Sequence, residues 1–232
     1  MAGWFGKRKR QRQQNAALDA IMGAAQERGI PTMRVDDPDE LAISLGLAQQ
    51  QQGNLAQAEE TFRLIAGDGR RAAPKASFYL GVVQQDRGDL AGAQASFRQA
   101  LTASDPQVVA GAAVNLASLL VEQHEVAEAE RLMCQAETTC PPYAARARFN
   151  LGCLLALQGR NQEAEASFHW VIDGRDRDEA PGAMTHLAAL YFRTGRFEES
   201  ERLYRQVLAS GHREFTPLAA AGLADIQGRR GS

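Results

Sequence analysis

The sequence predicts an all-α, right-handed solenoid of helix-turn-helix repeats, about five repeats with a capping helix at each end. The first observation is a recurring segment: Leu80–Leu101 reads LGVVQQDRGDLAGAQASFRQAL, and similar segments begin at Leu45 and Leu151. Looser copies begin at Leu116 and Leu187. The second observation is the nearly constant spacing of these segments. Self-similarity at a fixed period of about 20–50 residues is typical of solenoids.

A small residue follows the first leucine of every segment and defines the register of the repeats. These residues are spaced by 35, 36, 35 and 36 positions, at Gly46, Gly81, Ala117, Gly152 and Ala188. Within each repeat, apolar residues recur three and four positions apart in two runs, which is the period of an amphipathic helix. We expect the small residue to lie where two helices cross closely, because a large side chain would separate them.

A turn residue separates the two helical runs of each repeat. Glycine stands there in four repeats, at Gly53, Gly88, Gly159 and Gly195, and His124 stands there in the third. Glycine adopts the left-handed conformation that ends a helix without a Cβ clash. We therefore expect His124 to cost about 1 kcal/mol or to loosen its turn.

These features resemble the tetratricopeptide repeat, a helix-turn-helix unit of about this length. The shared pattern is the Leu-Gly pair, the turn glycine, an alanine and a phenylalanine four positions apart, such as Ala93 and Phe97, and a final Ala-Leu. The resemblance covers roughly 39–212. Small residues such as Ala42 replace the bulky aromatic that is usual early in the first helix, and the closing proline is clear only at Pro141.

The ends of the chain differ from the repeats and give the expected domain organisation. Residues 1–14 are expected to form a basic, disordered leader, 15–36 an N-terminal capping helix and linker, 37–214 the five repeats, and 215–232 a C-terminal capping helix and tail. A helix at 15–28 would place Leu18, Ile21, Met22 and Ala25 on one face. Solenoids need such lids because each repeat buries its apolar face only against its neighbours.

Composition and cysteine usage indicate an intracellular chain. The three cysteines, Cys134, Cys140 and Cys153, are odd in number and form no CxxC pair, which argues against a disulfide framework and favours a reducing compartment. The N-terminus lacks the apolar run of a secretory signal, and no segment approaches the ~20 apolar residues of a membrane span. The sequence therefore predicts a cytoplasmic protein. We expect the cysteines on helices to be small buried hydrophobes.

A search for chemistry predicts no enzyme, no metal site and no cofactor. The histidines His124, His169, His186 and His212 belong to different repeats, and no pair has metal-ligand spacing. No glycine loop is suited to phosphate, and no catalytic constellation is present. Glutamates of the second helices, among them Glu59, Glu128, Glu130, Glu163 and Glu165, are expected to form a solvated outer face.

The resemblance implies that first helices line a concave groove that binds peptides or partner helices. Asn115 and Asn150 occupy the place where groove asparagines of this family commonly grip the backbone of a ligand. An amide offers one acceptor and two donors, so it can satisfy both polar groups of a peptide unit. The alternative is that both asparagines bridge neighbouring helices. His186 shares their register one repeat further on.

Specificity would come from side chains that flank these positions. Phe78, Tyr79, Val82, Phe149 and Phe192 would accept apolar anchors, and Lys75, Arg146 and Arg193 would bind carboxylates. Some family members capture a terminal carboxylate with basic and amide residues, but Gly111 and Gly182 stand at two of those places. A chaperone C-terminus is therefore not the first choice of ligand.

The N-terminal tail combines two aromatic residues with five positive charges, at Trp4, Phe5, Lys7, Arg8, Lys9, Arg10 and Arg12. The formal net charge is -2, so these five cations leave -7 for the rest of the chain. Such a tail suits a membrane surface with anionic lipid, or nucleic acid, and the alternative is a solvated leader.

Together these features predict a non-enzymatic protein-protein interaction module, a scaffold that binds a peptide or helix of a partner protein in its concave groove. The alternatives are a tethering protein whose tail binds membrane or nucleic acid, and a repeat protein that self-associates.

Overall fold

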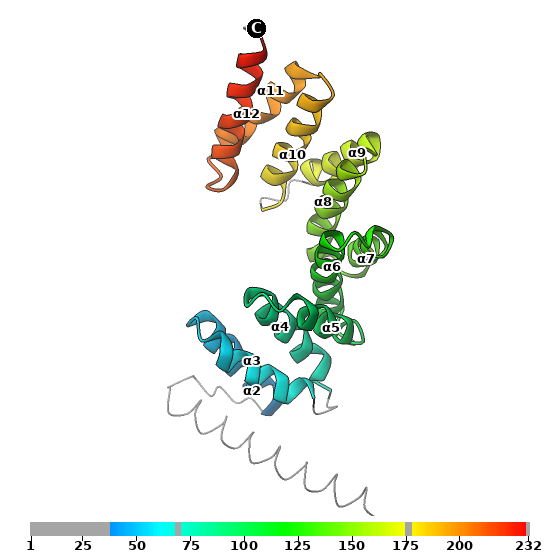
Figure 1. Ribbon diagram of the computed structural model, residues 1–232, viewed down its shortest axis with the longest axis vertical. Helices are drawn as coiled ribbons and strands as arrows, with labels where there is room; N and C mark the ends of the chain where they lie inside the picture. Colours follow the sequence, from blue (N-terminus) through cyan, green and yellow to red (C-terminus); the bar gives the residue numbers. More distant parts are fainter. Residues whose placement is uncertain (1–37, 68–70, 175–177, 231–232) are drawn as a thin grey trace, which may run out of the picture. The chain divides into compact units, whose positions relative to one another are not determined.

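A computed structural model of the chain describes residues 38–67, 71–174 and 178–230, and these residues form α-helices and no strand (Figure 1). The helices are α2 (Pro38–Gln51), α3 (Leu55–Ala66), α4 (Ala73–Asp86), α5 (Leu90–Ala100), α6 (Pro106–Glu122), α7 (Val126–Thr139), α8 (Pro141–Leu157), α9 (Asn161–Asp173), α10 (Ala180–Arg193), α11 (Phe197–Ser210) and α12 (Phe215–Arg230). Within this described part, no helix is long and apolar enough to cross a membrane. The predicted all-α solenoid of helix pairs is confirmed.

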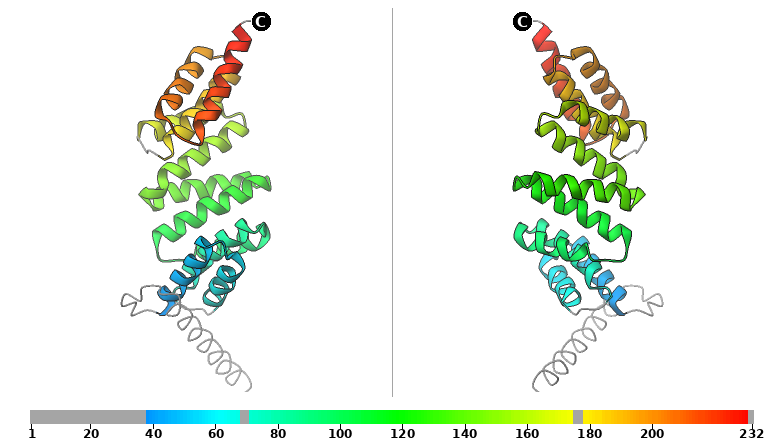
Figure 2. Two further views of the ribbon diagram at one scale, coloured as in Figure 1. Left: turned by 90° about the vertical axis from the view of Figure 1, so that its left-hand side faces the viewer. Right: turned by 90° about the vertical axis from the view of Figure 1, so that its right-hand side faces the viewer.

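The chain divides into two compact units, 1–116 and 117–232, and the boundary falls inside α6. In the first unit α3 packs on α2 and α4, and α4 packs on α5. In the second unit α8 packs on α7 and α9, and α10 packs on α9 and α11. The final helix, α12, covers α11 and also contacts α10. Figure 2 shows these neighbouring helices from two further sides.

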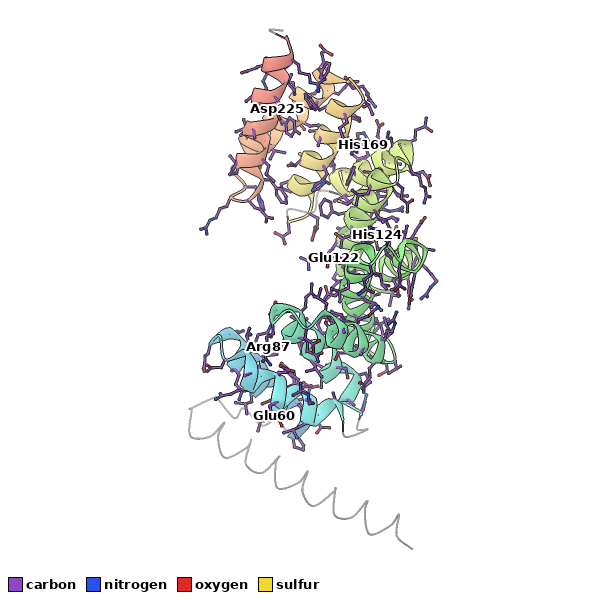
Figure 3. All side chains as sticks on the ribbon, in the orientation of Figure 1. Glu60, Arg87, Glu122, His124, His169 and Asp225 are labelled. Carbon is purple, nitrogen blue, oxygen red and sulfur yellow. The ribbon has the colours of Figure 1, made fainter. Side chains whose placement is uncertain are left out.

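The turn inside each described repeat uses the left-handed backbone conformation, as the sequence predicts. The turn glycines have φ angles of 77° at Gly53, 81° at Gly88, 74° at Gly159 and 81° at Gly195. His124, labelled in Figure 3, takes the same place with a φ of 63°. It is the one non-glycine residue with positive φ among the described residues. A side chain with a Cβ is strained in this conformation, so the third repeat has the least favourable turn.

The small residue of the Leu-Gly pair lies against an aromatic ring, which confirms the predicted close crossing. A Cβ built on Gly46 would stand 2.6 Å from a ring carbon of Phe62. The corresponding distance from Gly152 to the ring of Phe168 is 2.8 Å. Each phenylalanine belongs to the second helix of the same repeat and is fully buried. Glycine therefore lets the first helix pack directly on this ring.

The last helix, α12, also places a glycine against an aromatic ring, in this case a ring of the preceding helix α11. A Cβ on Gly222 of α12 would stand 2.3 Å from the ring of Tyr204, which lies on α11. Tyr204 belongs to an apolar cluster that also contains Val207, Ala219 and Ile226. Ala219 and Ile226 are buried side chains of α12. The helix thus closes the apolar face of α11 at this end of the second unit.

The prediction that second-helix glutamates form a solvated outer face is wrong for Glu59, Glu130 and Glu165, which bind arginines of the next repeat. Glu59 is 6% exposed and is bound by Arg63 and by Arg87, which is labelled in Figure 3. Glu130 accepts a hydrogen bond from Nη1 of Arg160 at 2.9 Å. In each case an arginine at the turn of one repeat reaches back to the preceding repeat. The cause is repeat stacking, which brings each turn beside the preceding second helix.

The cysteines also differ from the expectation of small buried hydrophobes on helices. Cys134 on α7 is exposed, and Cys153 on α8 is half-buried. Cys140 lies at the junction of α7 and α8 and is 4% exposed. All three are free thiols. The exposed position of Cys134 follows from its side of α7, because the buried residues of that helix are Ala129, Leu132, Met133 and Ala136.

Candidate functional site

A cavity of about 250 Å³ opens between α8 and α10 in the second unit. Its walls come from two consecutive first helices, and the ring of Phe168 on α9 contributes to its lining. The lining residues are Cys153, Ala156, Leu157, Phe168, His186, Ala189, Leu190 and Arg193. Six of these eight side chains are aliphatic, aromatic or thiol groups, so the cavity is mainly apolar.

His186 is one of the residues that line this cavity, and it packs against two aromatic rings. Its ring centroid is 5.2 Å from that of Phe149 in an edge-to-face arrangement, and 6.1 Å from that of Phe168. Nδ1 of His186 is 3.7 Å from Sγ of Cys153. Although one side of His186 is exposed, this packing shields the ring from water and lowers its pKa, because burial disfavours the imidazolium.

The Cys153–His186 pair is uncharged and does not form a nucleophile. Burial raises the pKa of the Cys153 thiol to about 12. A reactive cysteine needs a lowered pKa, supplied by a cation or a helix N-terminus, and His186 is neutral in this setting. The pair therefore adds a weakly polar contact to the cavity wall. It supplies no catalytic group.

Two of the exposed residues that line the cavity stand at the ends of helices. Leu157, the last residue of α8, is 74% exposed although it is a large apolar side chain. Arg193, the last residue of α10, is also exposed. No hydrogen bond or ion pair joins Arg193 to another residue within the described part of the chain. The ends of α8 and α10 therefore offer one apolar and one cationic side chain to a ligand.

The other two cations predicted to bind ligand carboxylates already hold carboxylates of the chain. Nζ of Lys75 on α4 is 2.9 Å from both oxygens of Glu40 on α2. Burial alone would lower the pKa of Lys75, but the bond to Glu40 outweighs it and the pKa is raised. Nε of Arg146 on α8 donates to Glu179 at 2.9 Å. Both cations are compensated in the structure.

The predicted aromatic positions of the first unit form a small ring cluster on α4. Phe78 and Tyr79 are half-buried, with ring centroids 5.2 Å apart. Tyr79 stacks on Phe62 at 5.5 Å, and Phe78 lies 6.2 Å from Phe97. Val82 is half-buried one turn further along α4. These side chains cover the rings of second helices α3 and α5.

Asn115 on α6 and Asn150 on α8 are half-buried. Neither side chain makes a hydrogen bond to another residue in the part of the chain that the structure describes. Neither amide is among the fully buried, unsatisfied groups, so both keep access to solvent. The two asparagines belong to different compact units. Each amide is available to a ligand in its own unit.

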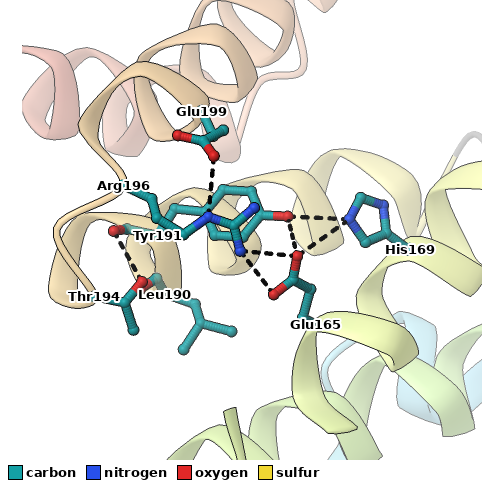
Figure 4. A network of polar contacts seen from close by, with 7 residues as sticks. All are labelled: Glu165, His169, Leu190, Tyr191, Thr194, Arg196 and Glu199. Atoms are coloured by element: carbon teal, nitrogen blue, oxygen red, sulfur yellow. Dashed lines mark hydrogen bonds and ion pairs between the residues drawn. The ribbon is translucent and has the colours of Figure 1, made fainter. Parts of the chain in front are cut away.

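A polar network fastens α10 and α11 to α9 (Figure 4). The Tyr191 hydroxyl donates to Oε1 of Glu165 at 2.6 Å, and Nη1 of Arg196 lies 3.0 and 2.9 Å from the two Glu165 oxygens. The Arg196 guanidinium also lies 3.9 Å from the Tyr191 ring centroid. Nε2 of His169 is 3.0 Å from the Tyr191 hydroxyl. The network connects the fourth and fifth repeats.

The network shifts the pKa values of Glu165 and Tyr191. Burial alone would raise the pKa of Glu165, but hydrogen bonds from Tyr191 and Arg196 outweigh it and hold the pKa below its usual value. Burial and the bond to Glu165 raise the pKa of Tyr191 to about 12. Both oxygens of the Glu165 carboxylate thus already accept hydrogen bonds, as is typical of a carboxylate with a structural role.

No metal-binding cluster of three or more His, Cys, Asp and Glu residues exists among the described residues. The cavity of the second unit is lined by apolar groups, a thiol, an imidazole and one cation. Such groups can bind a peptide through apolar contact, hydrogen bonds and charge.

Comparison with known protein families matches the repeat pattern directly. The family model described as a tetratricopeptide repeat-like domain matches residues 42–190, which is more than half of the chain. A second model, described as a tetratricopeptide repeat, matches residues 182–215. The chain belongs to the tetratricopeptide repeat family. Proteins of this family are generally non-catalytic interaction modules.

Three solved structures illustrate the similarity of fold. A tetratricopeptide repeat protein from Parabacteroides merdae is 22% identical with a TM-score of 0.66, covering 83% of this chain and 73% of that one. BtubC from P. vanneervenii is 17% identical with a TM-score of 0.65, covering 88% and 90%. The pilF protein of Pseudomonas aeruginosa is 23% identical with a TM-score of 0.61, covering 79% and 88%. Comparison with curated proteins gives no match.

The tetratricopeptide repeat fold brings only some of the predicted site residues together. Phe149, His186 and Arg193 lie at or beside the cavity of the second unit. Phe192 instead packs on Phe197 at 5.5 Å, within the apolar cluster at the end of that unit. The tail residues Trp4, Phe5, Lys7, Arg8, Lys9, Arg10 and Arg12, the expected leader and the helix at 15–28 lie outside the described residues.

Gly182 has a packing reason that the sequence does not reveal. A Cβ there would stand 3.0 Å from the ring of Phe215 on α12 and 3.4 Å from that of Phe149 on α8. A basic side chain of the kind used for terminal carboxylates would meet these rings. The absence of a side chain at Gly182 therefore belongs to the packing of α8, α10 and α12.

Leu157 is one of the cavity residues that sequence reasoning missed, although the repeats contain a signal for it. Counting from the first leucine of each segment, the same position holds Gln51, Asp86, Glu122 and Arg193 in the other repeats. A polar side chain is thus the rule at the end of the first helix. A leucine at this position has no role in the helix pattern, and a comparison of the aligned repeats would have identified it.

Proposed function

We propose that this chain is a non-enzymatic scaffold that captures a peptide or a helix of a partner protein on the surface of its first helices. The observation that carries the proposal is the state of the two groove asparagines: Asn115 and Asn150 are half-buried and their amides bond to no other described residue. An amide that had a bridging role between helices would be bonded within the fold. Each free amide can instead donate to and accept from one peptide unit of a ligand.

The cavity of the second unit supports the same proposal. Specific recognition of a peptide needs anchoring pockets beside the groups that hold its backbone. Asn150 and the cavity residue Cys153 both lie on α8, and Phe149 packs on the cavity residue His186. The chain therefore combines a backbone-binding amide with a neighbouring apolar pocket.

Replacement of both asparagines by alanine tests the proposal. The wild-type chain and the Asn115→Ala/Asn150→Ala variant are used to capture proteins from an extract of the native cell, and the affinity of the captured partner is then measured with purified components. At each unit, one lost hydrogen bond worth about 0.5–1.5 kcal/mol should weaken binding by about twofold to tenfold.

The matched control replaces two exposed amides on second helices, Gln57→Ala on α3 and Gln162→Ala on α9. This variant should bind as the wild type does. Circular dichroism and the denaturation midpoint establish whether the asparagine variant is folded. A folded asparagine variant with undiminished affinity would contradict the proposed surface. An unfolded one would show that the asparagines are structural.

A further inference from the structure

The size of the cavity between α8 and α10 restricts what it can hold. Its volume of about 250 Å³ lies below the ~300–1,000 Å³ that is common for sites of small molecules and cofactors. Its lining includes Leu157 and Arg193, the exposed last residues of α8 and α10. A space of this size suits one or two side chains of a peptide.

The interior of the cavity favours an apolar side chain. Ala156, Ala189 and Leu190 line it together with the ring of Phe168. His186 and Cys153 are its polar members, and they contact each other. Water in such a space finds few partners, so an apolar group that displaces it gains the contacts and removes apolar surface from water.

Leu157 adds an apolar surface that the fold itself does not use. The other repeats place Gln51, Asp86, Glu122 and Arg193 at this position, so a polar residue is compatible with the helix pair. Leu157 is nevertheless 74% exposed. A ligand that covers this leucine extends the apolar contact to the end of α8.

Arg193 sets the sign of the charge beside the apolar anchor. Of the residues that line the cavity, it alone carries a full charge near neutral pH, because Cys153 is a thiol and His186 is neutral. Lys75 and Arg146 hold Glu40 and Glu179, whereas Arg193 has no partner in the described structure. A guanidinium in this state can bind a carboxylate through two parallel hydrogen bonds.

We infer that the second unit recognises an acidic peptide segment, in which a large apolar side chain fills the cavity against Phe168 and Leu157 while a neighbouring Asp or Glu carboxylate binds Arg193. This inference rests on the proposed function and specifies the chemistry of its ligand. The apolar part supplies the contact area, and Arg193 rejects peptides with a cation at the neighbouring position.

The test uses the full chain and a library of randomised peptides displayed on phage. The wild type should enrich peptides with a large apolar residue beside Asp or Glu. The Arg193→Glu variant should enrich peptides in which Lys or Arg replaces the acidic residue while the apolar residue is kept. This exchange of the preferred charge is an effect that a structural role of Arg193 would not produce.

Affinity measurements on one enriched peptide complete the test. Leu157→Gln, which introduces the residue of the first repeat at an exposed position, should weaken binding about tenfold without changing the helix content. Arg193→Gln should weaken binding and should remove most of its dependence on salt. Gln162→Ala on the exposed side of α9 is the matched control and should leave the affinity unchanged.

The outcomes separate this inference from the proposed function. Peptides that bind the wild type, Leu157→Gln and Arg193→Glu equally would overturn the inference and leave the scaffold function in place. Enrichment of basic peptides by the wild type would also overturn it. If the wild type enriches no peptide over the bare support, both the inference and peptide capture by this chain fail.

Discussion

Gly81 lies directly against the ring of Phe97: a Cβ built on Gly81 would stand 2.6 Å from ring carbon Cε1. The two residues join the first and second helices of one repeat, α4 and α5. Phe97 is fully buried. The Gly81–Phe97 contact therefore sets how closely the two helices of this repeat approach.

Gly81→Ala should lower the free energy of unfolding by about 1–3 kcal/mol, because overpacking forces a shift of the ring or of the helix. Denaturant unfolding followed by circular dichroism measures the change. The matched control is Gly228→Ala on α12, where no atom lies within 4 Å of the new Cβ. That variant should be neutral or stabilising, because alanine has the higher helix propensity. Equal effects at both sites would contradict the steric explanation.

His124→Gly should raise the free energy of unfolding by up to about 1 kcal/mol. His124 has a φ of 63°, and a left-handed conformation costs a residue with a side chain roughly 1–2 kcal/mol, part of which glycine gives back as unfolded-state entropy. Gly88→Ala is the reverse experiment, since Gly88 has a φ of 81° and open space around a new Cβ. It should destabilise by about 1 kcal/mol. The denaturation midpoints of both variants should move in opposite directions.

Glu165→Gln should weaken the junction of the fourth and fifth repeats. The pKa of Glu165 is lowered in the folded chain, so its ionisation contributes stability above the unfolded pKa of about 4.3, and this contribution is lost as the pH falls through the folded value. The variant should be less stable near neutral pH and should lose less stability on acidification. Stability curves as a function of pH measure both effects.

A double-mutant cycle that combines Glu165→Gln with Tyr191→Phe tests the hydrogen bond between these two side chains. Tyr191 donates to Glu165, so the two substitutions should be non-additive and their coupling should be positive, about 0.5–3 kcal/mol. Purely additive effects would show that the hydrogen bond contributes nothing to stability.

His186 should titrate below the ordinary histidine pKa of about 6.5, because its ring is packed against Phe149 and Phe168. The neutral form is the native one, so its contribution to stability is complete above about pH 6.5 and is lost as the pH falls through the folded pKa. NMR titration of the His186 ring measures this pKa, with His186→Gln as the variant that assigns the signal. A pKa at or above about 6.5 would contradict the packing argument.

Protonation of His186 should also weaken a ligand that fills the cavity, because it places a charge beside the apolar anchor. The affinity of the wild type should fall on acidification, and the affinity of His186→Gln should change less. This comparison separates the effect at the cavity from general effects of pH on the peptide.

The helix pairs, their period and their turns can be derived from the residue pattern alone. These features depend on local sterics: a left-handed turn requires glycine or strains another residue, and a close crossing requires a small side chain. Gly53, Gly88 and His124 could therefore be assigned before the structure, as could the crossing at Gly81. The physical cause and the sequence signal lie within the same repeat in each case.

Which of the predicted side chains are available for binding depends on how the repeats pack against each other. Lys75 and Arg146 had the same sequence-based role as Arg193, but stacking of the repeats places Glu40 and Glu179 on the first two and leaves Arg193 exposed. The same stacking brings Glu165 into an ion pair with Arg196 and places Leu157 in the lining of the cavity. These contacts join residues of neighbouring repeats, whose side chains meet only after the helices have packed. The residue pattern within one repeat therefore does not predict these contacts between repeats.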